Sequence, residues 1–100
     1  MIKVLIESKD NKINTIEIKG HANYAIKGQD IICAGVSAVL AGINNLQEVK
    51  KFYIENKDGY TLIKKLEEIS FHDEIVLETI ITSLKAIEES YGKYLTIKNL

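Results

Sequence analysis

The stretch that decides the fold is IKGHANYAIKGQDIICAGVSAVLAGI, residues 18–43, because its hydrophobic period changes from that of a strand to that of a helix. Alternation of apolar residues ends at Gly20-His21, and residues 22–29 show no period, as is typical of a loop. From Asp30 onward, apolar residues recur at helical three-and-four spacing: Val36, Val39, Leu40, Ile43 and Leu46. The stretch therefore predicts a strand end, a loop and a helix start.

The start of this helix has a suitable cap. Asp30 is a favoured N-cap residue, and it places Cys33, the only cysteine of the chain, at the third helical position. Gly35 and Gly42 weaken the helix unless another element packs close to their bare backbones. Before the cap, Gly28 can supply a positive φ angle in the loop.

Two β-hairpins are predicted, one on each side of this helix. Residues 2–8 and 13–19 alternate in polarity and are separated by the polar turn 9–12. After the helix, apolar residues alternate on both sides of Asp58-Gly59, a dipeptide that is typical of tight hairpin turns. These two hairpins account for four strands.

The C-terminal third is predicted to form one long helix and a short strand. Residues 70–73 have the composition of a helix start, and Gly92 is a natural stop signal. Residues 94–98 have the pattern of a final strand. Between these signals, one apolar stripe follows helical spacing: Leu77, Ile80, Ile81, Leu84, Ile87 and Tyr91.

The order of elements indicates an α+β fold. Strand, strand, helix, strand, strand, helix and an optional last strand predict a mixed or antiparallel sheet of four to five strands. Two helices would pack on this sheet, most simply on one face. The chain contains no linker or repeat, so we expect a single domain over residues 1–100. A domain of this size often gains stability by self-association.

Composition narrows the function classes. The formal net charge is -1, and all 13 basic residues are lysines. Without arginine, the chain lacks the side chain best suited to bidentate phosphate or guanine contacts, so direct nucleic-acid binding is not expected. No apolar run is long enough for a membrane span or a signal-peptide core. One cysteine cannot form an internal disulfide, so we expect a reducing, cytoplasmic environment.

Cys33 and His21 are the candidate chemical groups. A cysteine at a helix start meets the partial positive charge of unpaired N–H groups, which favours the nucleophilic thiolate. His21 ends a strand that should enter the same region, so its imidazole can accept the thiol proton. First-turn N–H groups would also suit an oxyanion. The parts for acyl transfer are therefore present.

Each of these residues also has a structural interpretation. A lone cysteine at a helix start is often a small core residue, and a lone histidine at a strand end is often a satisfied polar group. The charge of Asp30 opposes thiolate formation unless His21 is protonated. Ser37 shares the helix face of Cys33, where its hydroxyl can serve the site or bond back to helix carbonyls. One cysteine and two histidines give no recognised metal-ligand spacing, so neither a metal nor a cofactor is expected.

The segment GHANYAIKGQDIICAGVSAVL resembles the signature of the ribosomal-processing cysteine protease family, often called Prp. That signature combines Gly-His-Ala, a loop with Gly-x-Asp, and Cys-Ala followed by a serine on the next helix. The KDGY hairpin and the segment IEESYGKYLTI are also similar, although Gly92 stands where the family often has proline. The matching positions are Gly20, His21, Ala22, Gly28, Asp30, Cys33, Ala34 and Ser37.

The resemblance implies an endopeptidase that acts without a cofactor. The family removes a short amino-terminal extension from large-subunit ribosomal protein twenty-seven, after an aromatic pair, so that the mature protein can assemble into the ribosome. It implies Cys33 as the nucleophile and His21 as the general base, in a homodimer. Gly20, Asp30 and Ser37 would be supporting positions.

No Asp or Asn lies at a spacing that would orient His21, so we expect a catalytic dyad and not a triad. The loop of residues 22–29 would gate the substrate, through Ala22, Asn23, Tyr24 and Gly28. Two other functions stay open. One is a non-enzymatic ribosome-associated binding module, and the other is a thiol-based redox sensor, although the chain has no second cysteine for an internal disulfide switch.

Overall fold

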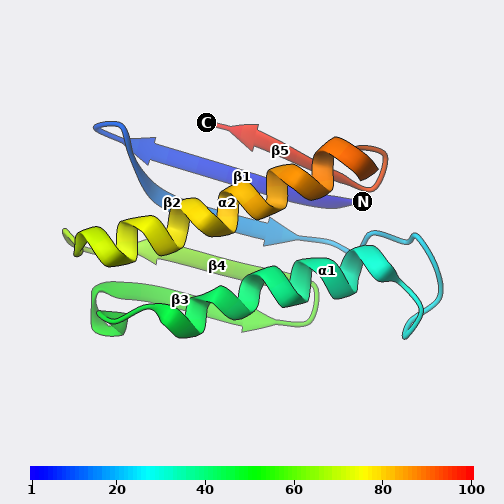
Figure 1. The fold of residues 1–100 in the computed structure, drawn as a ribbon, viewed down its shortest axis with the longest axis horizontal. Helices are drawn as coiled ribbons and strands as arrows, with labels where there is room; N and C mark the ends of the chain where they lie inside the picture. Colours follow the sequence, from blue (N-terminus) through cyan, green and yellow to red (C-terminus); the bar gives the residue numbers. More distant parts are fainter.

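The computed structural model describes all residues, 1–100, and confirms the predicted order of elements (Figure 1). Its helices are α1 (Ile31–Leu40) and α2 (Phe71–Tyr91), with short 3₁₀ turns η1 (Ala41–Asn45) and η2 (Val49–Lys51) after α1. The strands are β1 (Ile2–Lys9), β2 (Lys12–Lys19), β3 (Phe52–Lys57), β4 (Tyr60–Lys65) and β5 (Leu95–Asn99).

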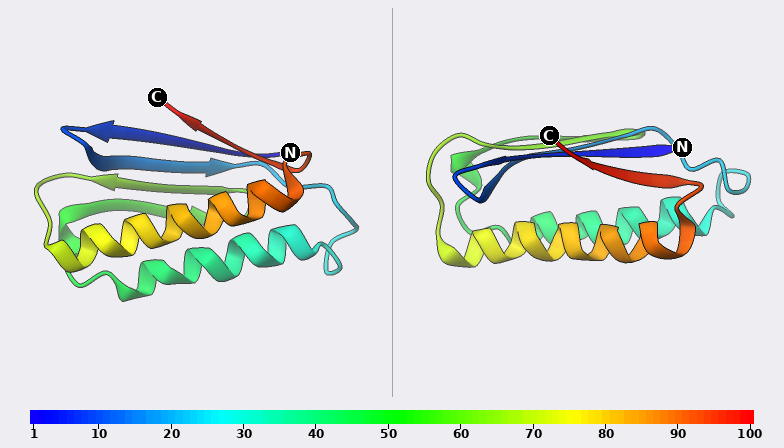
Figure 2. Two further views of the ribbon diagram at one scale, coloured as in Figure 1. Left: turned by 45° about the horizontal axis from the view of Figure 1, so that its top comes forward. Right: turned by 90° about the horizontal axis from the view of Figure 1, so that it is seen from above.

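The five strands form one mixed sheet in the order β3-β4-β2-β1-β5. Neighbouring strands are antiparallel except for β1 and β5, which run parallel. The optional last strand is therefore real, and it lies at the sheet edge beside β1. Both helices cover the same face of the sheet, as expected (Figure 2).

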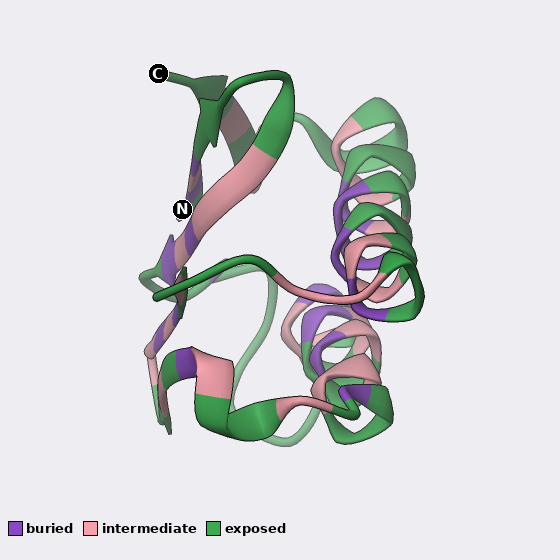
Figure 3. Cartoon of the chain, turned by 90° about the vertical axis from the view of Figure 1, so that its left-hand side faces the viewer, coloured by how far each residue is buried: buried purple, intermediate pink, exposed green.

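The hydrophobic core lies between the sheet and the two helices. It is one cluster of 17 buried residues, and Figure 3 shows the buried positions on the facing sides of the two layers. Burying each large aliphatic side chain contributes about 1.5–3 kcal/mol to folding. The opposite sheet face carries the alternate residues, such as the exposed Lys3 and Glu7.

The first helix is shorter than its apolar period predicted, because the segment through Leu46 tightens into η1. Gly42 lies against α2, where a Cβ atom would be 3.3 Å from Ile80 Cγ1. The chain is then held by the buried Asp73 carboxylate, which accepts hydrogen bonds from the N–H groups of Gln47 at 2.9 Å and Glu48 at 2.8 Å. A long-range contact therefore ends the helical run.

The second helix has the predicted bounds. The side chain of Ser70 caps it by accepting a hydrogen bond from the Asp73 N–H, and the helix ends at Tyr91 before Gly92. The apolar stripe is buried from Leu77 to Leu84 and is exposed at Tyr91. No helix of the structure combines the length and the apolar content that a membrane crossing requires.

Candidate active site

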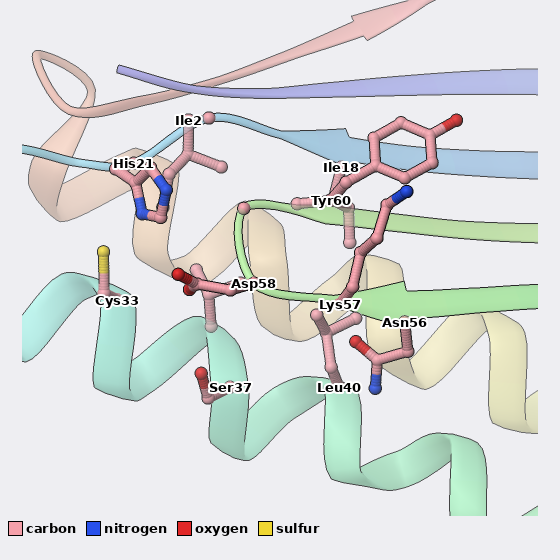
Figure 4. Close-up of a pocket in the computed structure, with 13 residues that line it drawn as sticks. Ile2, Ile18, His21, Cys33, Ser37, Leu40, Asn56, Lys57, Asp58 and Tyr60 are labelled. Carbon is pink, nitrogen blue, oxygen red and sulfur yellow. The ribbon is translucent and has the colours of Figure 1, made fainter.

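Two of the predicted site residues, His21 and Cys33, meet a third polar residue, Asp58, where three elements come together (Figure 4). His21 follows β2, Cys33 lies in the first turn of α1, and Asp58 lies in the turn between β3 and β4. The three residues line two adjoining cavities of about 330 and 420 Å³. The fold therefore places His21 and Cys33 at the same two cavities.

Cys33 is a free, half-buried thiol at the third position of α1. Its sulfur accepts a hydrogen bond from the backbone N–H of Ala22 at 3.5 Å. Ala22 itself is buried. Its N–H group is therefore a hydrogen-bond donor placed beside the thiol.

Asp30 is the N-cap of α1 and also holds the loop to the helix. One carboxylate oxygen accepts hydrogen bonds from the N–H groups of Ile32 and Cys33, each at 3.0 Å. The other accepts from Tyr24 at 3.0 Å and from Ala25 at 3.5 Å. The bond from Cys33 is the main cause of the lowered pKa of Asp30; desolvation opposes it, and the other three N–H groups add to it.

Three of the helix-start N–H groups are engaged in this conformation and are not free to hold an oxyanion. Those of Ile32 and Cys33 donate to the Asp30 side chain, and that of Ala34 donates to the Asp30 carbonyl at 3.0 Å. For these three groups the prediction of oxyanion donors is therefore not met in this conformation. The donor at the Cys33 sulfur is the Ala22 N–H, which the sequence did not indicate because a backbone group leaves no signal in residue type.

His21 is exposed on its side chain and anchored through its backbone. Its carbonyl accepts a hydrogen bond from the amino terminus of Met1 at 2.6 Å. The preceding Gly20 has φ +100°, and a Cβ atom there would collide with the Met1 carbonyl. Figure 4 shows the imidazole and the Cys33 sulfur facing the same cavity, although no hydrogen bond joins them in this conformation.

Two further polar side chains line both cavities. Ser37 lies one turn after Cys33, and its hydroxyl makes no hydrogen bond back to the helix, so it remains available to a bound molecule. Asp58 projects from the β3–β4 turn toward the site (Figure 4). The Asp58-Gly59 dipeptide indicated a turn, but nothing in its spacing indicated that the turn would reach His21.

The loop of residues 22–29 covers one side of the site, with Asn23, Lys27 and Gly28 lining the second cavity. Its backbone is left-handed at Asn23, φ 56°, and at Gly28, φ +90°. The Tyr24 ring packs edge-on against Tyr94 at 5.1 Å and against Tyr91 at 6.0 Å between ring centroids. The loop is therefore fastened at Asp30 and at this tyrosine cluster.

The second histidine lies elsewhere. His72 is at the start of α2, where its ring bonds the buried Asp73 carboxylate at 2.9 Å. No group of three or more His, Cys, Asp or Glu side chains is arranged to hold a metal ion.

Comparison with known proteins agrees with this arrangement. The family model described as cysteine protease Prp matches residues 1–96. The ribosomal processing cysteine protease Prp of Staphylococcus aureus is 32% identical over 99 residues, which cover 93% of each chain. The protein of the same name from Bacillus subtilis is 35% identical over 107 residues, covering 97% of this chain and 96% of the relative.

Two solved structures of the S. aureus protease share the fold over the full length of both chains. The form with a covalently linked product peptide has a TM-score of 0.90 and 30% identity. The form with a substrate peptide has a TM-score of 0.74 and 27% identity. With a cysteine nucleophile candidate at the start of α1 and these relatives over nearly its whole length, the chain belongs to the Prp family and is a cysteine protease.

Proposed function

We propose that this protein is an endopeptidase that removes the N-terminal extension of large-subunit ribosomal protein twenty-seven and so supports ribosome assembly. The observation that carries the proposal is the meeting of His21, Cys33 and the Ala22 N–H beside two cavities. The names of the relatives supply the ribosomal substrate class. The whole chain, residues 1–100, would act as one protease domain, in the cytoplasm and as a homodimer.

The proposed reaction uses a Cys33–His21 dyad. His21 accepts the thiol proton, and the Cys33 sulfur forms a bond to the scissile carbonyl carbon. The Ala22 N–H, which already points at the sulfur, lies close enough to stabilise the oxyanion that develops beside it. When the C–N bond breaks, the imidazolium gives its proton to the leaving amine. Water then hydrolyses the thioester and restores the thiol.

The aromatic side chains of the substrate would lie in the first cavity, which α1 and the sheet line with apolar side chains. The first cavity runs from Cys33 along α1, and apolar side chains form its floor: Ile2, Ile18, Val36 and Leu40. Aromatic rings gain the most from such a floor because they bury a large apolar area. We propose this cavity as the cleft for residues next to the scissile bond.

The loop of residues 22–29 would act as the gate. Ala22 stays bound through its N–H group to the Cys33 sulfur, but the rest of the loop has few attachments. These are two N–H groups bound by Asp30 and the packing of Tyr24 on two tyrosines. Releasing these contacts would open the second cavity while the helix and the sheet stay in place. Such lids commonly close over a bound substrate and exclude water from the reaction.

The test is cleavage of a synthetic peptide that spans the extension of the ribosomal protein. We expect the wild-type protein to cut it and Cys33→Ala to show no cleavage above background. Cys33→Ser, which keeps a weaker nucleophile of similar size, should retain binding of the peptide with little cleavage. Cleavage by Cys33→Ala at the wild-type rate would overturn the proposal, and peptide binding without cleavage by the wild type would favour a binding module.

A further inference from the structure

We infer that Gly59, in the β3–β4 turn, is a positioning residue that sets where the His21 imidazole lies. The inference rests on the proposed role of His21 as the general base. A Cβ atom at Gly59 would lie 2.7 Å from His21 Nε2, 3.3 Å from Cε1 and 3.5 Å from Cδ2. The ring therefore rests directly on the bare backbone of the turn, at distances that no side chain at this position would permit.

The backbone is also tied to Gly59 at Gly20, the residue just before His21. The Gly20 N–H donates a hydrogen bond to the Gly59 carbonyl at 3.0 Å. This bond continues the β2–β4 pairing, whose last matched residues are Lys19 and Tyr60. Because the ladder fixes the two backbones, His21 cannot retreat from a larger residue by a small shift of its main chain. Only rotation of the imidazole, away from its present place at the cavity, would relieve the collision.

Gly59 also has φ +75°, which by itself favours glycine in a tight turn. The positive φ angle and the contact with the imidazole are thus two explanations for glycine at this position. They differ in what a substitution would affect. Backbone strain lowers the stability of the fold wherever it occurs. Displacement of an exposed imidazole disturbs little packing, so it costs the fold little but moves the proton acceptor away from Cys33.

The test compares two substitutions at Gly59 with a matched control in the other hairpin turn. Gly59→Ala adds both the Cβ atom and the backbone strain of a positive φ angle. Gly59→Asn adds the Cβ atom with less strain, because asparagine adopts positive φ angles more readily than alanine. Asn11→Ala, at φ 63° in the β1–β2 turn, adds comparable strain at the opposite end of the sheet (Figure 1). The measurements are Tm, kcat and KM for the peptide, and the alkylation rate of Cys33 by iodoacetamide.

We expect both Gly59 variants to lower kcat by about 10- to 100-fold with KM nearly unchanged, since small displacements of a catalytic group have effects of this order. Asn11→Ala should lower Tm and leave kcat within about twofold. Alkylation should slow in the Gly59 variants, toward the rate of His21→Ala. In a His21→Ala background, substitution of Gly59 should slow alkylation no further, because the displaced ring is already absent.

Equal kcat values for Gly59→Asn, Asn11→Ala and the wild type would overturn the inference. A further loss of alkylation rate in the His21→Ala background would also overturn it, because Gly59 would then act without the imidazole. The alkylation comparison needs no ribosomal peptide. If the wild type fails to cleave the peptide but the alkylation rates follow the expected order, the proposed substrate is wrong and the positioning role stands.

Discussion

The two helix starts of this molecule each have an aspartate and a nearby histidine, but they serve different ends. At α1, Asp30 caps the helix and Cys33 lies in its first turn; at α2, Ser70 caps the helix and Asp73 follows. A histidine accompanies each. Asp73 is fully buried and joins α2 to the chain after α1, whereas Asp30 is half exposed and joins a loop to the site. The buried carboxylate therefore joins two parts of the core, whereas the half-exposed one lies beside the proposed nucleophile, Cys33.

The largest expected difference between the two helix starts lies in their histidines. His21→Ala should lower kcat by about 10²–10⁴-fold, the range attributed to general acid–base catalysis, because the Cys33 proton then has no acceptor. His72→Ala should keep kcat within about twofold, because that ring lies at the other helix start. Steady-state cleavage of the extension peptide measures both. Equal losses in the two variants would contradict the separation of roles.

The next largest expected effect is a loss of folding stability when Asp73, at the start of α2, is substituted. Asp73→Ala leaves the N–H groups of Gln47 and Glu48 without their acceptor. Gln47 is exposed and Glu48 is half-exposed, so each lost partner costs toward the lower end of the range of about 1–3 kcal/mol. We therefore expect a loss of about 2–4 kcal/mol in the free energy of unfolding, measured by urea denaturation. At temperatures where the variant stays folded, Cys33 should react with iodoacetamide at the wild-type rate. A free energy of unfolding equal to that of the wild type would show that the Asp73 carboxylate does not hold the chain after α1 to the start of α2.

The smallest expected effect is a loss of folding stability at low pH, to which the carboxylates of Asp30 and Asp73 both contribute. The pKa of Asp30 is lowered chiefly by the Cys33 N–H; for Asp73, burial acts to raise the pKa, but the bonds from Gln47, His72 and Glu48 outweigh it. A lowered folded-state pKa means that each group adds stability above the ordinary value of 3.8. That stability is lost as the pH falls through the folded-state pKa.

Substitution by asparagine tests this acid dependence. Asp30→Asn and Asp73→Asn should each flatten the fall in Tm between neutral pH and pH 3, because an amide does not titrate. Asp30→Asn has one acceptor oxygen in place of two, so it can cap α1 or hold Tyr24 but serves both less well. We therefore expect it to expose the loop to limited proteolysis. If Tm falls with pH as steeply in both variants as in the wild type, these carboxylates do not cause the loss of stability in acid.

Local patterns in the sequence were sufficient for most of the fold. The change of period around Asp30 predicted the cap and the helical position of Cys33, and the alternation around Asp58 predicted the second hairpin. The early end of α1 could not be predicted, because it depends on Ile80 and Asp73, which are distant in the chain.

The site shows the same limit. The two residues of the proposed dyad could be named from the sequence because residue type and helix position carry the signal. The placement of Gly59 against His21 depends on the pairing of β2 with β4, which no local pattern reports. The Ala22 N–H at the sulfur is a backbone group, so residue type says nothing of it. What sequence reasoning missed is therefore long-range or main-chain in origin.

The central claim is that Cys33 attacks the peptide and carries the acyl group. The most direct measurement is intact-protein mass spectrometry of the wild type, quenched in acid during cleavage of the extension peptide. The proposed mechanism predicts an added mass on Cys33 that equals the released extension less one water. Hydroxylamine should remove this mass, and Cys33→Ala should not acquire it. Undiminished product formation by Cys33→Ala, with no adduct on the wild-type thiol, would contradict it.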